Sequence, residues 1–264
     1  MPELAEVAYY AKQWDAGLGR RIEKVEMHPQ ARVFRDMVKP EALKRILQGK
    51  CYEESRTHGK RMYFRFGDIW LSGHLGMTGK LWTADHDYKP EKHDHLVLCQ
   101  DGQQLVFTDP RMFGYWQKYD VASWQDLWEN LPSEVTNSGF TKAALAAFLK
   151  RRARSPLKAV VLDQEMFPGV GNWMADEVLW RCLFDPRKLA GTLTESEITT
   201  LWQKTRLVCR QAMKVIATDW NTPPDTWLFN HRWQDSGTCP CGAPLVRETI
   251  GERTTCWCPT CQES

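Results

Sequence analysis

Five cysteines crowd the last 26 residues of the 264-residue chain, and their spacing is the strongest constraint on its fold. The segment reads Cys239-x-Cys241, then sixteen residues, then Cys258-x-x-Cys261, with Cys256 shortly before the second pair. Two short-spaced pairs joined by a hairpin-length segment allow four thiolates to converge on one tetrahedral zinc ion. We therefore expect a β-hairpin zinc finger in which Cys239, Cys241, Cys258 and Cys261 hold one structural Zn²⁺. Cys256 is a competing ligand, because the first pair is one residue shorter than the usual C-x-x-C.

Composition narrows the class of protein further. The chain has 35 Lys+Arg and 33 Asp+Glu, a formal net charge of +2, so any site for a polyanion has to be local. No stretch reaches the roughly 18 to 20 apolar residues of a membrane span, and charged residues stand where a signal peptide would be apolar. We expect a soluble, intracellular protein. The other cysteines lie among apolar neighbours and are expected to be reduced core residues: Cys51, Cys99, Cys182 and Cys209.

The first half of the chain predicts a helix followed by β-structure. Apolar residues recur at helical spacing from Pro2 to about Gly17. Alternating, aromatic-rich runs between Arg21 and Tyr119 predict an antiparallel β domain, with a short helix over residues 40–48. The clearest strand candidates are RMYFRF (61–66), DIWLSGHL (68–75) and HLVLC (95–99).

The second half is predicted to be helical, and the turn-rich segment 131–139 separates it from the first. The expected helices cover residues 141–152, 157–163, 172–183 and 194–217. A Thr194-x-x-Glu197 capping box opens the last helix. The fold class is thus α+β, with three expected parts: residues 1–131, 140–220 and 228–264.

A glycine-containing turn at residues 168–171 precedes the helix that begins at Asn172. The free N–H groups and positive dipole end of such a helix suit a phosphate, and Lys158 is close in sequence. The alternative is a plain connection between two helices.

The extreme N-terminus reads Met1-Pro2-Glu3. Removal of the initiator Met would leave Pro2 as a free secondary amine beside a carboxylate, which is a nucleophile capable of forming a Schiff base. The alternative is that Pro2 is a helix N1 residue and Glu3 a partner of the helix dipole.

The motifs decide between these alternatives only when they are taken together. They occur in one order, over nearly the whole chain: MPELAEV at the start, HGK (58–60), GHLGMTG (73–79), DPRMFG (109–114), LDQEMFPGVGN (162–172) and the terminal four-cysteine finger. This set resembles the formamidopyrimidine-DNA glycosylase and endonuclease VIII family.

The resemblance implies an N-terminal helix and β-sandwich joined to a helix-two-turn-helix domain with a zinc finger. It also implies a base-excision repair enzyme that flips and removes an oxidised or ring-opened base and cleaves the strand by β,δ-elimination. Pro2 would form the Schiff base and Glu3 would be its acid/base partner. Glu6 matches a second acidic residue of the family. Lys60 matches a lysine that contacts phosphate, or is an ordinary exposed hairpin residue.

The remaining matched positions are expected to bind double-stranded DNA that contains damaged bases or abasic sites. Met77, Arg111 and Phe113 match the set that fills the void left by the flipped base. Lys158, Asn172 and Arg253 match phosphate contacts. His74 is either structural or a phosphate contact. We expect a monomer in the cytoplasm of a bacterial-type cell, associated with the nucleoid, or otherwise intracellular, with no membrane partner.

Three departures from the family pattern leave the preferred base open. Ala5 replaces a common proline, the finger begins with C-x-C, and residues 217–239 are shorter than the region that normally caps 8-oxoguanine. Formamidopyrimidines, oxidised pyrimidines and other modified bases all remain candidates.

Two alternative functions also remain: a catalytically inactive DNA-binding paralogue with a zinc finger, and an abasic-site lyase without base specificity. The run His93-Asp94-His95 invites a metal-site interpretation, but we expect it to be part of a strand.

Overall fold

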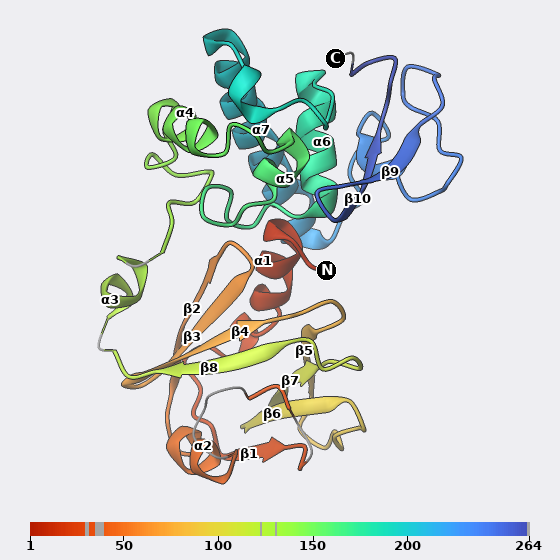
Figure 1. Ribbon diagram of the computed structural model, residues 1–264. Helices are drawn as coiled ribbons and strands as arrows, with labels where there is room; N and C mark the ends of the chain where they lie inside the picture. The colour runs from red at the N-terminus through yellow and green to blue at the C-terminus, as the bar shows by residue number, and fades with distance from the viewer. Residues whose placement is uncertain (30–31, 35–39, 122, 130, 263–264) are drawn as a thin grey trace. The chain divides into compact units, whose positions relative to one another are not determined.

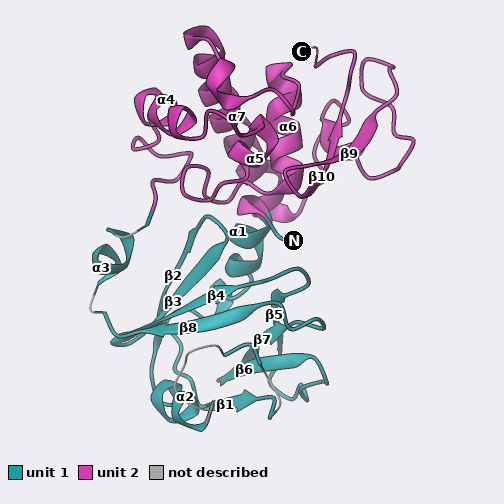
Figure 2. Cartoon of the chain, viewed as in Figure 1, with its two compact units in different colours: residues 1–2, 6–131 teal, residues 3–5, 132–264 magenta. Residues whose placement is uncertain are grey.

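The computed structural model describes residues 1–29, 32–34, 40–121, 123–129 and 131–262. These residues fall into two compact units (Figure 2). Unit 1 contains residues 1–2 and 6–131, and unit 2 contains residues 3–5 and 132–264. Within the described ranges, no helix combines the length and apolar character that crossing a membrane requires.

Unit 1 is built on two four-stranded antiparallel sheets, with strand orders β1-β6-β7-β5 and β2-β3-β4-β8 (Figure 1). The strands are β1 (Lys24–Met27), β2 (Tyr52–His58), β3 (Arg61–Phe66), β4 (Ile69–His74), β5 (Lys80–Asp85), β6 (Asp94–Gln100), β7 (Gln103–Thr108) and β8 (Tyr115–Tyr119). The predicted antiparallel β domain is confirmed, and the run RMYFRF coincides with β3. Gly67 and Gly102 have positive φ values of 62° and 79°, so each can make the tight turn between its two strands.

Large side chains from both sheets form the core of the sandwich. Trp14 stacks on Trp116 with ring centroids 5.5 Å apart, and its indole N–H donates to the carbonyl of Val106 at 3.2 Å. Both tryptophans are fully buried, together with Phe64 and Phe107. Burial of these aromatic surfaces is a main source of stability for the unit.

The N-terminal helix is shorter than the sequence predicted. Helix α1 covers Leu4–Lys12, and a 3₁₀ turn, η1, follows at Asp15–Gly17. A Cβ atom at Gly17 would lie 2.5 Å from Oε1 of Gln100, so a larger residue in this turn would displace the buried side-chain amide of Gln100.

Two further helices belong to unit 1. The predicted helix at residues 40–48 is confirmed as α2 (Pro40–Leu47). Helix α3 (Trp124–Trp128) was not predicted, although Ser123 and Asp126 form a capping box at its start.

Unit 2 contains four helices and a hairpin. The helices are α4 (Lys142–Arg151), α5 (Leu157–Val161), α6 (Asn172–Cys182) and α7 (Glu195–Asp219), with short 3₁₀ turns η2 (Ala190–Thr192) and η3 (Leu228–Asn230). The hairpin pairs β9 (Val246–Ile250) with β10 (Arg253–Trp257). The predicted helices agree to within two residues at each end, and the capping box of Thr194 and Glu197 is present.

Helix α6 is the centre of unit 2. It packs against α5, α7, η3 and β10. Eight of its residues are buried, including both acidic residues, Asp176 and Glu177. A helix of this kind needs polar partners for its buried charges, and these partners position the candidate functional residues described next.

Candidate functional site

Glu3 is bound to the N-terminus of α6. Its side chain is 3% exposed, and its carboxylate accepts hydrogen bonds from three backbone N–H groups: Gly171 at 2.8 Å, Trp173 at 2.9 Å and Met174 at 3.1 Å. The first amides of a helix have no partner within the helix, and the helix dipole is positive there. The carboxylate therefore satisfies three donors and is stabilised as an anion. The helix N-terminus that the sequence suggested for a phosphate is occupied by a carboxylate of the same chain.

Gly171 makes this approach possible. A Cβ atom at residue 171 would lie 2.2 Å from Cδ of Glu3 and 2.4 Å from its Oε1. In addition, Leu4 donates its backbone N–H to the carbonyl of Gly169 at 3.0 Å. The start of the chain is thus fixed at two consecutive residues, and Pro2 directly precedes the fixed carboxylate.

Lys158 is buried and paired with an acid, contrary to the prediction from the sequence. It was expected to contact a phosphate, but its side chain has no exposed surface and its ammonium group is paired with Asp176. It also donates to the backbone carbonyl of Asn172 at 2.9 Å. Burial lowers the pKa of Lys158, while the neighbouring Asp176 opposes this shift. Lys158 therefore joins α5 to α6 through these contacts, and its charge is compensated inside the protein.

Asp176 connects the zinc hairpin to these helices. Its carboxylate also accepts hydrogen bonds from Arg232, at 2.5 Å from Nη2, and from the backbone N–H of Cys256 at 3.1 Å. The residue is 1% exposed. The sequence did not single out Asp176, since nothing local marks an acidic residue of a helix as buried.

Asn172 and Arg253 are brought together by the same hairpin. The amide of Asn172 donates to the carbonyl of Thr254 at 2.8 Å, and Arg253 is the exposed residue just before it. A Cβ atom at Gly251 would lie 2.7 Å from Cβ of Ala159, so the hairpin turn packs closely on α5. Oδ1 of Asn172 is buried and has no hydrogen-bond partner among the described residues.

The expected void-filling residues of unit 1 lie on two loops that Asp109 holds together. Its buried carboxylate accepts hydrogen bonds from Thr78 Oγ1 at 2.6 Å and from the backbone N–H groups of Arg111 at 3.3 Å and Gly114 at 2.7 Å. A Cβ atom at Gly76 would lie 2.4 Å from the backbone of residues 113 and 114, so the two loops are in close contact. The sequence motifs contained Asp109 but did not reveal this function.

The side chains carried by these loops are exposed and mostly apolar. Met77, Met112 and Phe113 are 44%, 37% and 48% exposed. The guanidinium group of Arg111 lies 4.6 Å from the ring centroid of Phe113. Exposure of several neighbouring apolar side chains to water is unfavourable. Their position on loops that a buried carboxylate holds in place is typical of a binding surface.

Lys60 lies in a turn of unit 1, and His74 is the last residue of β4. Lys60 follows Gly59 in the turn before β3, and Arg61 pairs with His74 across β3 and β4. The ring of His74 stacks on Tyr115 at 5.1 Å, and its Nδ1 accepts the N–H of Gly76 at 3.0 Å.

The protonation state of His74 follows from its surroundings. Burial, reinforced by the charges of Arg61 and Lys60, lowers the pKa of His74 to about 4, so the ring is neutral at pH 7. Because Nδ1 is the acceptor, Nε2 carries the proton and can donate a hydrogen bond.

Two expected catalytic residues are placed by α1. Pro2 is partly buried and precedes the helix, and Glu6 is a partly buried residue of its first turn. Pro2 and Glu6 group with unit 1, and Glu3 groups with unit 2.

Four cysteines form a cluster that fits one structural zinc ion. The sulfur atoms of Cys239, Cys241, Cys258 and Cys261 lie within 4.8 Å of one another. Cys239 is 3.9 Å from Cys261, and Cys241 is 3.7 Å from Cys258. A tetrahedral zinc ion with bonds of about 2.3 Å requires sulfur atoms about 3.8 Å apart, in agreement with both distances. Cys256 is buried in β10 and is not part of the cluster.

We expect Gly171→Ala to destabilise the protein by about 2 kcal/mol or more, because the new methyl group displaces the Glu3 carboxylate and leaves buried donors unsatisfied. Urea unfolding measures the change. Gly19→Ala is the control: its Cβ would meet nothing within 4 Å, so only the backbone cost of its positive φ remains. Equal effects of the two substitutions would contradict the role assigned to Gly171.

Asp109→Asn should loosen both loops, since one carboxylate oxygen is replaced by an NH₂ group that faces the N–H of Gly114. We expect amide hydrogen exchange of residues 75–79 and 110–114 to accelerate by about tenfold or more. Asp101→Asn, in an exposed turn of the same unit, is the control. Unchanged exchange in both loops would show that Asp109 does not hold them.

Metal analysis should find about one zinc ion per chain, and Cys241→Ala should abolish it. Cys256→Ala is the matched control and should retain the metal. Loss of zinc from the Cys256 variant alone would reverse the ligand assignment.

Comparisons with known proteins identify the family. The model of the formamidopyrimidine-DNA glycosylase N-terminal domain matches residues 1–116, and that of the formamidopyrimidine-DNA glycosylase H2TH domain matches residues 131–222. A formamidopyrimidine-DNA glycosylase of Roseiflexus sp. (strain RS-1) is 32% identical, covering 99% of this chain and 100% of that protein.

Solved structures agree over the full length. The wild-type Lactococcus lactis Fpg bound to DNA with an oxidized pyrimidine has a TM-score of 0.88 and 28% identity, with all of both chains covered. The same enzyme bound non-covalently to DNA with an AP site has a TM-score of 0.86 and 28% identity, covering 99% of this chain and 100% of that chain. The chain therefore belongs to the formamidopyrimidine-DNA glycosylase family of base-excision repair enzymes.

Proposed function

We propose that this protein is a bifunctional DNA glycosylase and abasic-site lyase that uses Pro2 as its nucleophile. The observation that carries the proposal is the immobilised Glu3 carboxylate, held by three backbone N–H groups directly after Pro2 in the chain. The Glu3 carboxylate is buried at a helix N-terminus and requires a glycine at residue 171, which is more than a residue that only caps a helix needs. This arrangement suits a carboxylate that must stay in one place next to a reacting amine.

The reaction begins when the nitrogen of Pro2 attacks C1′ of the damaged nucleotide. A bond forms between this nitrogen and C1′ while the glycosidic bond breaks, and the departing base takes a proton from water. The Glu3 carboxylate accepts the proton that the Pro2 nitrogen loses and passes it to O4′ as the C1′–O4′ bond breaks, which opens the sugar and gives the iminium ion. Removal of a proton from C2′ then expels the 3′ phosphate, and a second elimination expels the 5′ phosphate.

The DNA contacts in this proposal come from both units. Lys60, Asn172 and Arg253 bind phosphates, and the Nε2–H of His74 donates to another. Met77, Arg111 and Phe113 fill the space of the flipped nucleotide: two apolar side chains at the base step and a guanidinium group that hydrogen-bonds the orphaned base. Lys158 takes no direct part. Its role is to hold α5 against α6.

The parts of the chain divide the work in this proposal. Residues 1–131 carry the nucleophile and the void-filling loops, residues 140–220 hold Glu3 and Asn172, and residues 228–264 present Arg253. One copy of the chain acts on double-stranded DNA in the cytoplasm.

The base pocket is proposed to prefer oxidised pyrimidines over the larger 8-oxoguanine. Support comes from the short segment 217–239, which is tied down along its length. The amide of Asn230 donates to the carbonyl of Pro223 at 2.7 Å, and the ring of Phe229 lies 4.9 Å from Trp173 and 5.3 Å from Trp233. A segment held in this way has little freedom to fold over a large base.

Borohydride trapping on duplexes with an abasic site, formamidopyrimidine, dihydrouracil or 8-oxoguanine tests the proposal. Pro2→Gly should reduce the trapped complex on every duplex by about 10²-fold, because a flexible amine is no longer held in position. Pro90→Gly, in an exposed loop, is the control. Glu3→Gln should retain more trapping on the abasic duplex than on the base lesions, because the abasic sugar has already lost its base.

The outcomes separate the alternatives. Trapping by the wild-type protein only on the abasic duplex would identify a lyase without base specificity. Binding to every duplex with no trapped complex would identify an inactive DNA-binding paralogue and reject the catalytic proposal.

A further inference from the structure

The outer face of α7 carries a groove that the proposed reaction does not use. Two adjoining hollows of about 450 and 330 Å³ lie along this helix, and both are lined by Lys204 and Leu207. The end of α6 forms one wall, and α6 and α7 pack side by side within unit 2 (Figure 1). We define this surface, the α7 groove, by these lining residues: Leu183, Trp202, Lys204, Leu207, Arg210 and Trp227.

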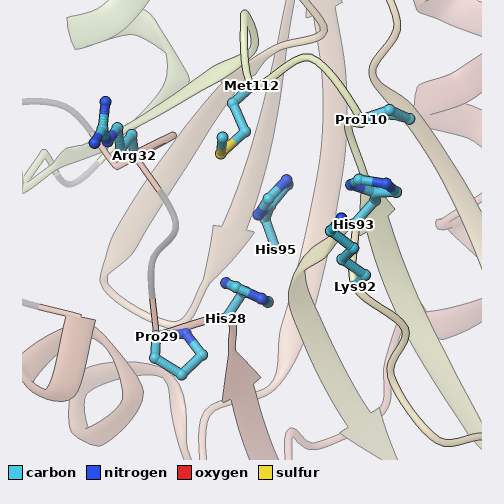
Figure 3. A pocket seen from close by; sticks show the side chains of 8 residues that line it. All are labelled: His28, Pro29, Arg32, Lys92, His93, His95, Pro110 and Met112. Atoms are coloured by element: carbon cyan, nitrogen blue, oxygen red, sulfur yellow. The ribbon is translucent and has the colours of Figure 1, made fainter.

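The location of the groove separates it from the proposed contacts with DNA. Asn172 is the first residue of α6 and Leu183 directly follows the last, a separation of about 16 Å at roughly 1.5 Å per residue. The pocket of about 870 Å³ in unit 1 is different, because Figure 3 shows that Pro110 and Met112 line it. That pocket adjoins the void-filling loop 110–114 and therefore belongs with the proposed DNA-binding surface.

Leu183 is an unusual residue for its position in the backbone. It ends α6 in the left-handed conformation, with a φ of 59°, and the N–H of Phe184 donates to the carbonyl of Leu179 at 3.1 Å. Glycine is the usual residue at this place in a helix terminus, because a Cβ atom makes the left-handed conformation unfavourable. Leu183 is also 59% exposed, so neither its backbone conformation nor burial favours a leucine. Strained residues of this kind cluster at functional sites, and a partner that covers the side chain would supply the missing burial.

The charges of the groove favour an acidic ligand. Arg181, the cation that α6 contributes, is already paired with Glu177 at 2.7 Å. Lys204 and Arg210 have no ion pair within the part of the chain that the structure describes. Residues 198–218 of α7 contain four cations and no acid: Lys204, Arg206, Arg210 and Lys214. Two uncompensated cations beside exposed leucines suit a ligand that combines carboxylates with an apolar group.

The aromatic rings of the groove are not available to stack on bases. The guanidinium group of Arg181 lies 4.5 Å from the ring centroid of Trp227, and that of Arg206 lies 5.1 Å from the ring centroid of Trp202. Arg206 is held there by backbone carbonyls at 2.8 and 3.3 Å. Single-stranded nucleic acids bind largely by stacking on open aromatic faces, whereas the exposed apolar surface here is aliphatic. A protein segment therefore fits the groove better than a nucleic acid.

We propose that the α7 groove binds an acidic peptide segment of another protein. A large apolar side chain of the peptide would lie against Leu183 and Leu207, and its carboxylates would pair with Lys204 and Arg210. An apolar centre with a charged rim is the usual arrangement of protein–protein interfaces, and complementary charge selects the partner. This inference goes beyond the proposed function, which needs no protein partner.

Selection of random twelve-residue peptides displayed on phage, against the zinc-loaded full-length protein, tests the proposal. We expect the selected peptides to contain more Asp and Glu than Lys and Arg, and at least one large apolar residue. Fluorescence anisotropy with the most enriched peptide then measures its affinity, which should decrease as the salt concentration rises.

Two substitutions remove the apolar centre of the groove. Leu183→Gly and Leu207→Ser should each weaken peptide binding by about tenfold. Leu183→Gly should not lower the stability of the protein in urea, because glycine is favoured at a φ of 59°, so a loss of binding is not a loss of folding. Leu189→Ser, which changes another exposed leucine of unit 2, is the control and should bind the peptide as the wild type does.

Charge reversal tests the cationic rim. Lys204→Glu combined with Arg210→Glu should weaken peptide binding by about 10²-fold, because like charges then face each other. Lys150→Glu makes the same kind of change at an exposed residue of α4 and should leave the affinity unchanged.

The proposal is overturned if no peptide is enriched, if the selected peptides are neutral or basic, or if the Leu183 variant binds them as the wild type does. Displacement of the peptide by a 20-base-pair duplex would assign the groove to nucleic acid and also reject it. A dimer in light scattering that Leu183→Gly dissociates would make a second copy of the chain the occupant instead.

Borohydride trapping on an abasic duplex separates this inference from the proposed reaction. The Leu183 and Leu207 variants should form as much trapped complex as the wild type. Failure of the groove and failure of the proposed catalysis are therefore distinguishable.

Discussion

The binding of Glu3 to the N-terminus of α6 is the interaction on which the proposed chemistry depends. The carboxylate is separated from its donors by 168 to 171 residues along the chain, so nothing local keeps it there. A buried charge is unfavourable unless it is compensated, and three backbone N–H groups at the positive end of a helix compensate it well. Since the peptide bond is short and rigid, fixing Glu3 also restricts where Pro2 can lie.

Asp109 solves a related problem in unit 1. The proposed contacts with DNA require Met77, Arg111 and Phe113 to be exposed, as they are, so these side chains are not held by burial in a core. Their loops are held instead by one buried carboxylate that accepts hydrogen bonds from a side chain of one loop and the backbone of the other. The cost of exposing apolar side chains is offset by order in the polar layer beneath them. In both units, therefore, a buried carboxylate positions candidate functional groups that themselves contribute little to the stability of the fold.

The sequence predicted the elements whose signals are local. The signals for β3 and for the capping box of α7 each lie within a few neighbouring residues, and the four zinc ligands follow from their spacing. Residue roles that depend on distant partners were not predictable in the same way. Lys158 lies in the basic run KRRARSPLK, which suggests an exposed cation. Its ion pair with Asp176 of α6 instead allows its side chain to be buried. Helix α3 is different, because its capping box was present in the sequence and its five residues were simply too short for a periodic pattern.

The hairpin shows how metal and protein share the work of placing Arg253. The four thiolates determine the local shape of the finger, but they do not determine its orientation relative to the helices of unit 2. That orientation comes from Asp176, which accepts the N–H of Cys256 while paired with Lys158 and Arg232. Loss of the metal would unfold a small hairpin, whereas loss of Asp176 would leave two buried cations without a counter-charge and damage the whole unit. Zinc is thus a local constraint within a docking arrangement that one aspartate maintains.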